Sequence, residues 1–242
     1  MPLSKQVILI TGAGGGLGSV AALALAQKGA QVILLDKLIP ALEKTYDAIV
    51  AAHAPEPIMY PFDLNGAGEQ DYLDLAARIE EEYGALQGLL HSAVAFKAFT
   101  PMICQSTTEW AHGLNVNLNA PFLLTKVLLP LLEKSAHASI VFTLDSSVSK
   151  APAYAGVYGV SKIALQGLAN IFAAELESGN KVRVNTLIPG PIDSPLRKKA
   201  YPGEDKTKLP DVQSLAPVYH YLFSSASIGI TGHTIDARTF HL

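Results

Sequence analysis

The sequence predicts an α/β protein with a doubly wound, mostly parallel β-sheet and helices on both faces. Two features of the sequence support this prediction. The apolar stretches are short and uninterrupted, and they alternate along the chain with longer stretches of helical pattern. An apolar stretch without polar alternation is typical of a strand that is buried on both faces. Strand–helix alternation with right-handed crossovers then produces an open parallel sheet, whose ligand crevice lies beyond the carboxyl ends of the strands.

Seven strands and six helices are expected. The strand candidates are residues 7–10, 32–35, 58–62, 86–90, 140–144, 182–188 and 228–235. The helix candidates are residues 17–28, 40–53, 69–84, 107–133, 157–177 and 211–224. The irregular stretch 189–210 is rich in Pro, Gly and charged residues, and a loop of this length in a compact domain usually has a function. We therefore expect one domain, residues 1–242, with a substrate lid near 189–210.

Composition limits the class of protein. Of 242 residues, 49% are hydrophobic and only 16% are charged, which excludes a disordered chain. The net charge of −3 provides no general attraction for nucleic acid or an anionic membrane. Cys104 is the single cysteine, so we expect neither a disulfide framework nor a bound metal. The N-terminal residues show no signal-peptide pattern and the apolar runs are too short to span a bilayer, which favours a cytoplasmic protein.

A glycine-rich turn follows the first predicted strand. Residues 11–18 read TGAGGGLG, in which Gly12 follows the strand and Gly16, Leu17 and Gly18 open the next helix. Glycine allows a sharp turn and lets a pyrophosphate approach the helix N-terminus, where a side chain would block it. A tight turn without a ligand is the simpler alternative, but it does not need so many glycines. The turn therefore predicts a dinucleotide-binding domain of the Rossmann type.

Asp36 ends the second predicted strand and bears on the choice of dinucleotide. A carboxylate at this place accepts hydrogen bonds from the adenosine ribose hydroxyls and repels the 2′-phosphate of NADP. Lys37 is a complication, because its ammonium could reach that phosphate. A helix-capping or solvated Asp36 is the alternative. We expect NAD(H) to be favoured, with NADP(H) possible.

Tyr158 and Lys162 stand four residues apart, which places them on one face of a predicted helix. Interconverting a ketone and an alcohol requires a hydride carrier and a proton donor at the oxygen. The pKa of a free tyrosine, near 10, is too high for ready proton exchange, and a neighbouring ammonium lowers it. An ordinary Tyr/Lys pair on a helix surface is the alternative. Combined with the glycine turn, the pair predicts an oxidoreductase acting on a secondary alcohol or ketone.

The motifs TGxxxGxG and YxxxK resemble the short-chain dehydrogenase/reductase family, and the resemblance covers essentially the whole chain. It is strongest to the single-domain oxoacyl-reductase-like and alcohol-dehydrogenase-like members. It implies that Tyr158 is the acid/base and that Lys162 also bonds the nicotinamide ribose. It implies further cofactor contacts at Asp63, Leu64, Pro189, Gly190, Ile192 and Ser194. It also implies a homotetramer or homodimer joined through the helices 107–133 and 157–177.

The chain departs from the family after the fourth predicted strand. Where the family usually carries NNAG, this sequence has His91, Ser92, Ala93 and Val94. Backbone contacts to the cofactor at His91 and Ala93 do not depend on side chains and could survive. Val94 in place of glycine requires a turn without a positive φ. We interpret His91 as a satisfied polar residue rather than a catalytic or metal-binding histidine, because no second ligand lies at a suitable spacing.

Two further catalytic positions follow from the resemblance. Asn117 matches the asparagine that distorts its helix and holds a proton-relay water. The serine that polarises the substrate oxygen commonly lies 13 residues before the tyrosine, where this chain has Asp145. The local sequence DSSV favours Ser147 instead, through a shortened loop, with Ser146 as an intermediate solution. A serine is preferred because an ionised carboxylate facing a developing alkoxide would hinder reduction.

The expected function is NAD(P)(H)-dependent interconversion of a secondary alcohol and a ketone. An acyl-thioester is one candidate for the small-molecule substrate, since basic residues of the lid could attract a phosphopantetheine arm. A solvated charged loop explains these residues equally well. No nucleic-acid or membrane partner is expected. The alternative is a dinucleotide-sensing binding or regulatory protein with lost or residual catalysis. The altered stretch 91–94 and Asp145 keep that alternative open.

Overall fold

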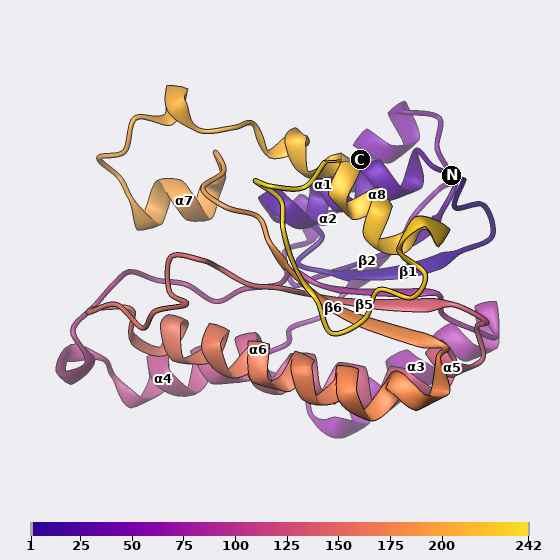
Figure 1. Cartoon of the computed structure of the whole chain (residues 1–242), viewed down its shortest axis with the longest axis horizontal. Helices are drawn as coiled ribbons and strands as arrows, with labels where there is room; N and C mark the ends of the chain where they lie inside the picture. Colours follow the sequence, from indigo (N-terminus) through magenta and orange to yellow (C-terminus); the bar gives the residue numbers. More distant parts are fainter. Residues whose placement is uncertain (1, 242) are drawn as a thin grey trace.

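The computed structural model describes residues 2–241 and confirms the predicted fold class (Figure 1). Its strands are β1 (Val7–Thr11), β2 (Gln31–Asp36), β3 (Ile58–Pro61), β4 (Gly88–His91), β5 (Ala138–Thr143), β6 (Val182–Ile188) and β7 (Thr234–Asp236). Within these residues they form one sheet in the order β3-β2-β1-β4-β5-β6-β7, and every neighbouring pair is parallel. The order reverses between β1 and β4, which is where such a sheet opens its ligand crevice.

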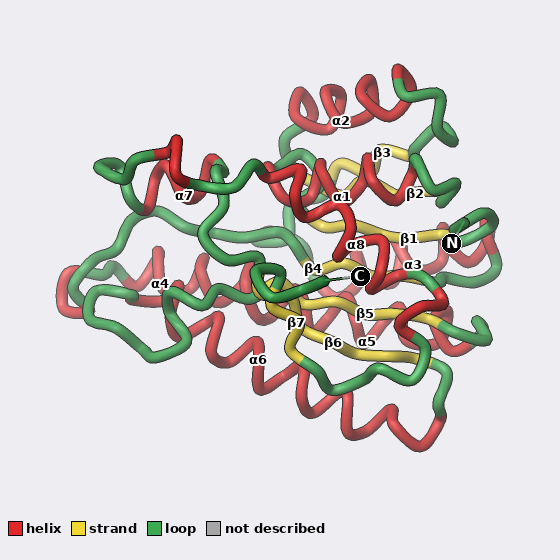
Figure 2. The backbone as a smooth tube through the Cα atoms, turned by 45° about the horizontal axis from the view of Figure 1, so that its top comes forward, coloured by secondary structure: helices red, strands yellow, loops and turns green. Residues whose placement is uncertain are grey.

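Helices cover both faces of the sheet (Figure 2). They are α1 (Gly16–Ala26), α2 (Ile39–Ala51), α3 (Glu69–Tyr83), α4 (Thr107–Leu114), α5 (Ala120–Glu133), α6 (Gly156–Leu176), α7 (Pro195–Ala200) and α8 (Ala216–Phe223). One layer contains α1, α2 and α8, and the other contains α3, α4, α5 and α6 (Figure 1). The inner strands β1, β2, β4, β5 and β6 are buried on both sides and are therefore mainly apolar, whereas the edge strands β3 and β7 are partly exposed.

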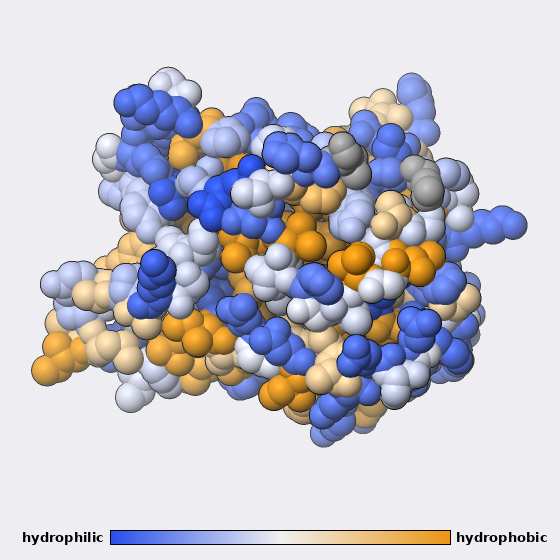
Figure 3. All heavy atoms as spheres, viewed as in Figure 1, coloured by the Kyte–Doolittle hydropathy of each residue, from blue (hydrophilic) through white to orange (hydrophobic). Residues whose placement is uncertain are grey.

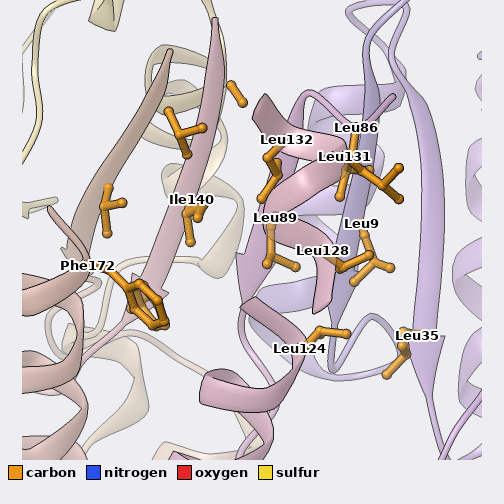
Figure 4. Packing of buried hydrophobic residues seen from close by; sticks show 14 of the residues in the cluster. Leu9, Leu35, Leu86, Leu89, Leu124, Leu128, Leu131, Leu132, Ile140 and Phe172 are labelled. Carbon is orange, nitrogen blue, oxygen red and sulfur yellow. The ribbon is translucent and has the colours of Figure 1, made fainter. Parts of the chain in front are cut away.

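Alternate side chains of β1 belong to two different hydrophobic cores. Val7 and Leu9 pack into the core beneath α3, α5 and α6, which also contains Leu124 and Leu128 of α5 (Figure 4). Ile8 and Ile10 point to the opposite face, into the core beneath α1, α2 and α8. Full burial of an aliphatic side chain contributes about 1.5–3 kcal/mol. The uninterrupted apolar strands of the sequence are therefore explained by burial on two faces.

The last strand is much shorter than its apolar sequence suggests. The expected strand 228–235 is observed only as β7, at Thr234–Asp236. Gly229 and Gly232 have φ angles of 85° and 73°, a left-handed conformation that breaks the extended backbone. The glycines therefore turn the chain before it can pair with β6.

The expected helix 107–133 is also interrupted. Between α4 and α5 the residues Asn115–Asn119 form a π-helix. An inserted π-turn rotates the side chains that follow it and is frequent at functional sites. The distortion lies at Asn117, as the family resemblance implied.

The stretch 189–210, expected to be irregular, contains the short helix α7. Pro195 begins this helix, and the Ser194 side chain accepts a hydrogen bond from the Arg197 backbone N–H at 3.2 Å. Both features are typical of a helix start. Asp193 and Asp211 form an isolated parallel bridge that ties the two ends of the stretch together. The stretch forms a lobe beside the main body of the protein (Figure 1).

Candidate active site

Two adjoining cavities open at the carboxyl ends of the central strands. Their volumes are about 260 Å³ and 220 Å³, and both are lined by Gly12, Gly15, Ser92 and Val94. The first cavity also contains the predicted site residues Gly16, Leu17, Gly18, Tyr158, Lys162, Pro189, Gly190, Ile192 and Ser194. The second also contains the predicted residues Asp36, Asp63, Leu64 and Ala93. An elongated ligand could therefore lie across the glycine turn with one end in each cavity.

The glycine turn leaves no room for side chains. A Cβ atom on Gly18 would lie 2.1 Å from the Gly12 carbonyl oxygen, and one on Gly12 would lie 2.7 Å from Ala93 Cα. Gly12 also has a φ of 67°, which L side chains rarely adopt. Gly15, at the N-cap of α1, has no side chain to cap the first turn, which leaves backbone N–H groups for an anion. The turn therefore fits the pyrophosphate of a dinucleotide.

Asp36 connects the glycine turn to the second cavity. Its carboxylate accepts hydrogen bonds from the backbone N–H groups of Gly14 at 3.2 Å and Leu38 at 3.1 Å. Lys37 lines the same cavity, together with Asp63. The adenosine end of the site therefore holds both an acidic and a basic side chain.

Tyr158 and Lys162 lie at the wall of the first cavity, on α6. Both are buried, with 5% and 6% of their surfaces exposed. The Lys162 ammonium donates a hydrogen bond to the Thr143 carbonyl oxygen, at 2.7 Å. Burial lowers the pKa of Lys162 to about 8, although the negative charge of Asp145 opposes that shift. The Tyr/Lys pair is thus part of the cavity and not of the surface.

Asp145, and not a serine, meets the tyrosine. The Tyr158 hydroxyl donates a hydrogen bond to Asp145 Oδ2 at 2.6 Å, and the Ser147 backbone N–H donates to Asp145 Oδ1 at 2.8 Å. Burial raises the pKa of Tyr158 far above its ordinary value, and the charge and hydrogen bond of Asp145 raise it further. The arrangement is the reverse of the one expected from a serine at this place.

The prediction of Ser147 or Ser146 as the partner of Tyr158 is therefore wrong for this structure. The Ser147 hydroxyl is buried and has no hydrogen-bond partner among residues 2–241. Neither serine lines the first cavity, whereas Asp145 does. The segment after β5 turns through positive φ angles at Ala151 and Tyr154, and its path places Asp145, not a serine, against Tyr158. Asp145, which stands 13 residues before the tyrosine and was passed over in favour of a serine, is the residue that contacts Tyr158.

His91 faces away from both cavities. Its ring stacks on Phe142, with centroids 4.6 Å apart, and its Nε2 lies 2.9 Å from the Thr125 hydroxyl. Complete burial lowers the pKa of His91 to about 3, so the ring is neutral near pH 7. The interpretation of its side chain as a satisfied polar group agrees with these contacts. Of the two backbone contacts expected here, only Ala93 lies at a cavity wall, and Val94 does not have a positive φ.

Asn117 is fully buried and forms hydrogen bonds with the segment that follows β4. Its Oδ1 accepts a hydrogen bond from the Ala95 N–H at 2.7 Å, and its Nδ2 donates to the Ala95 carbonyl and the Ser161 hydroxyl, both at 3.0 Å. Both N–H groups of the amide are therefore used. Asn117 holds residue 95 against α6, close to the turn that carries Tyr158.

Aromatic residues that the sequence analysis did not single out surround Tyr158. The rings of Phe96 and Phe99 lie 5.0 Å and 6.5 Å from the Tyr158 ring, and Tyr201 of the lid lies 5.5 Å from Phe99. The Lys199 ammonium donates to the Phe96 carbonyl at 3.0 Å. The lid is therefore attached to the segment 94–106 beside the tyrosine. These contacts join segments about a hundred residues apart, so local sequence patterns carried no signal for them.

Acidic neighbours neutralise part of the basic charge of the lid. Arg197 forms two hydrogen bonds of 2.6 Å with Glu204, and its guanidinium lies 3.8 Å from the centre of the Tyr201 ring. Lys198 pairs with Asp193 at 3.0 Å. Among the basic lid residues only Arg197 lines the first cavity. These pairs favour the interpretation of the lid as a charged surface over that of an anion-binding site.

The described residues contain neither a cluster of metal ligands nor a helix that could span a membrane. Between residues 2 and 241, no three His, Cys, Asp or Glu side chains converge in a way that could hold a metal ion. In the same residues, no helix has both the length and the apolar character needed to cross a bilayer.

Comparisons with known proteins agree with this geometry. The sequence model of the family described as short chain dehydrogenase matches residues 6–205. YciK of Escherichia coli K12, an uncharacterized oxidoreductase, is 36% identical over 236 residues, which cover 98% of this chain and 93% of YciK.

Two solved structures are similar over nearly their whole length. A candidate short chain dehydrogenase from Pseudomonas syringae is 42% identical, with a TM-score of 0.94, and the match covers 97% of this chain and 95% of that one. A second, from Shigella flexneri 2a and complexed with NADP, is 36% identical, with a TM-score of 0.93 and 98% of each chain covered.

Proposed function

The chain belongs to the short chain dehydrogenase family, and we propose that it interconverts a secondary alcohol and a ketone with a nicotinamide dinucleotide. The observation that best supports the proposal is the position of Tyr158 and Lys162 in the cavity that begins at the glycine turn. When bound, the dinucleotide supplies hydride transfer. The chain's own residues bind and orient the reactants, exclude water and move the proton.

Each part of the cavity has a task in this proposal. The glycine turn and the N-terminus of α1 hold the pyrophosphate. Pro189, Gly190, Ile192 and Ser194 line the nicotinamide end. Lys162 contributes positive charge beside the ribose, and the Tyr158 hydroxyl exchanges a proton with the substrate oxygen. The lid, attached near Phe96, covers the tyrosine and limits the access of water.

For the adenosine end we propose that both NAD(H) and NADP(H) are accepted. Asp36 favours NAD(H), because its carboxylate can bond the ribose hydroxyls and repels a 2′-phosphate. Lys37 lines the same cavity and can pair with that phosphate. The similar structure from Shigella flexneri holds NADP, which does not support the expected preference for NAD(H) and favours an adenosine site that accepts the phosphate.

Fluorescence titration with NADH and NADPH tests this cofactor assignment. We expect Lys37→Ala to weaken NADPH binding by about 10- to 150-fold and leave NADH unaffected, since one charge-assisted hydrogen bond contributes about 1.5–3 kcal/mol. Asp36→Ala should have the opposite selectivity, weakening NADH binding. The matched control is Lys44→Ala, because Lys44 is a basic residue of α2 that lines neither cavity. Failure of the wild-type protein to bind either dinucleotide would contradict the assignment.

A second candidate function is dinucleotide sensing without efficient turnover. The observation that favours it is the Asp145 carboxylate on the Tyr158 hydroxyl, at a place where carbonyl reduction needs a hydrogen-bond donor. Absorbance at 340 nm with a panel of secondary alcohols and ketones separates the two functions. Turnover with any substrate pair supports the oxidoreductase, whereas tight dinucleotide binding with no turnover supports the sensor.

We also propose that α5 and α6 join copies of the chain into a dimer or tetramer. Four large apolar side chains on these helices are exposed: Phe122, Val160, Ile163 and Ile171. Hydrophobic residues reach the surface over the start of α6 (Figure 3). Light scattering should detect an oligomer, and Ile171→Lys should weaken it. Ile228→Lys is the control and should leave the oligomer intact, because Ile228 is exposed but lies outside these helices. A monomeric wild-type protein would contradict this assembly.

A further inference from the structure

The pair Tyr158–Asp145 shares a proton between a phenol oxygen and a carboxylate oxygen. The Tyr158 hydroxyl donates to Asp145 Oδ2 at 2.6 Å, and the Ser147 backbone N–H holds Oδ1 at 2.8 Å. A carboxylate with two donors is suited to carry its negative charge. Two cations interact with that charge electrostatically, Lys162 and Arg197. Asp145 thus lines the first cavity with Oδ2 placed to accept the proton of Tyr158.

This arrangement opposes the simplest role for the tyrosine. A phenolate that waits for the proton of an alcohol would lie 2.6 Å from a carboxylate, and two like charges at that distance repel strongly. Burial acts in the same direction, because it disfavours the charged form of Tyr158. Tyr158 can therefore accept a proton only if it releases its own. The acceptor to which its proton is already hydrogen-bonded is Asp145 Oδ2.

We propose that Tyr158 and Asp145 form a two-step proton relay, with Asp145 as the final acceptor when an alcohol is oxidised. The proton of the alcohol O–H passes to the Tyr158 oxygen while the Tyr158 proton passes to Asp145 Oδ2. The alcohol C–H bond breaks, and its hydrogen leaves with the electron pair to the oxidant, an oxidised nicotinamide dinucleotide. The substrate loses one hydride and one proton and becomes a ketone. The inference rests on the proposed function.

The relay makes the two directions depend on opposite forms of Asp145. Oxidation requires the carboxylate, and reduction requires the carboxylic acid, because only the acid can return a proton through Tyr158. A lower pH should therefore favour reduction and a higher pH oxidation. Two cations also face Asp145: burial lowers the pKa of Lys162 to about 8, and the bond to Glu204 raises the pKa of Arg197. Tyr201 is the remaining titratable neighbour of Tyr158.

Tyrosinate absorbance at 295 nm tests the contact without any substrate or cofactor. Each protein is titrated to alkaline pH, and the curve of the matching Tyr158→Phe variant is subtracted to isolate Tyr158. We expect Asp145→Ser to ionise Tyr158 at least about one pH unit below the wild type, because a like charge has been removed. Ser147→Ala is the control and should leave the titration unchanged, since its hydroxyl contacts no polar group of residues 2–241. Identical curves for wild type and Asp145→Ser would overturn the proposal.

Kinetics with the fastest alcohol–ketone pair of the panel test the proton transfer itself. Asp145→Asn keeps the shape of the side chain but cannot accept the proton, so oxidation at pH 8 should fall about 10²-fold or more with unchanged dinucleotide affinity. Asp145→Ser supplies a hydrogen-bond donor and should raise the rate of reduction at neutral pH and flatten its rise toward acid pH.

Two outcomes distinguish the relay from the function on which it rests. An Asp145→Asn variant with wild-type oxidation and an unchanged pH profile overturns the relay and leaves the oxidoreductase function standing. If no pair of the panel turns over, the proposed function fails and the relay fails with it, while the 295 nm titration still decides whether Asp145 controls Tyr158. Thermal melting and dinucleotide titration of each variant identify those that do not fold.

Discussion

The two halves of the site are built in different ways. In the cofactor half, the shape of the cavity depends on glycines, which have no side chain. A Cβ atom on Gly18 would lie 2.1 Å from the Gly12 carbonyl oxygen. In the chemical half, the arrangement depends on side chains that meet, Tyr158 on Asp145 and Lys162 on Thr143. The first half is specified by backbone geometry, and the second by which residue of a loop faces inward.

This difference predicts that the halves can be damaged separately. Changes in the glycine turn should affect dinucleotide affinity and stability. Changes at Tyr158 or the loop after β5 should affect proton transfer while the dinucleotide still binds. Three substitutions test this separation, in order of decreasing expected effect.

Tyr158→Phe should produce the largest loss. Removing the hydroxyl takes away the proton-transferring group, which typically contributes 10²-fold or more to the rate. The ring still packs on Phe96, so dinucleotide affinity should stay within about twofold of wild type. Steady-state turnover and fluorescence titration measure the two effects. Tyr154→Phe, at an exposed tyrosine of the same loop, is the control. A variant that keeps more than about a tenth of the rate would show that the tyrosine is not the acid/base.

Gly18→Ala should have an intermediate effect, confined to the cofactor half. The added Cβ meets the Gly12 backbone, and overpacking of this kind typically costs about 1–3 kcal/mol. We expect dinucleotide affinity to fall by a factor of about 5 to 150 and the melting temperature to decrease. Gly167→Ala in α6 is the control, because its Cβ would meet nothing within 4 Å. Wild-type dinucleotide affinity in Gly18→Ala would mean that the turn can rearrange. It would contradict the claim that the backbone geometry of the turn specifies the cofactor half.

Ser147→Ala should have the smallest effect. Its hydroxyl is buried without a polar partner in the part of the chain described, so the alanine variant loses no hydrogen bond and should change stability by less than about 0.5 kcal/mol. Ser161→Ala is the contrasting variant, since the Ser161 hydroxyl bonds Asn117 and the Tyr158 carbonyl. That change should cost about 1–3 kcal/mol. Denaturant unfolding measures both. A severe loss of turnover in Ser147→Ala alone would restore the serine as the partner of the substrate oxygen.

The sequence was most informative where one local rule determines the structure. Apolar runs predicted the strands of the described sheet, and burial on two faces explains why β1, β2, β4, β5 and β6 show no polar alternation. The prediction was poorest for β7, where two positive-φ glycines ended a run that hydrophobicity alone would extend. In the lid, the prediction missed α7, although Ser194 and Pro195 carry a recognisable helix start.

The sequence by itself determined the doubly wound sheet, the glycine turn and the placement of Tyr158 and Lys162 on one helix face. These features follow from local periodicity and from the absence of side chains, which a linear sequence displays directly. Only the tertiary structure decided that Asp145 bonds the tyrosine, that His91 turns into the core and that the lid attaches beside Phe96. Those outcomes depend on how a long loop folds and on contacts between distant segments. Many loop paths satisfy the same local rules, and the packing of the whole domain selects one of them.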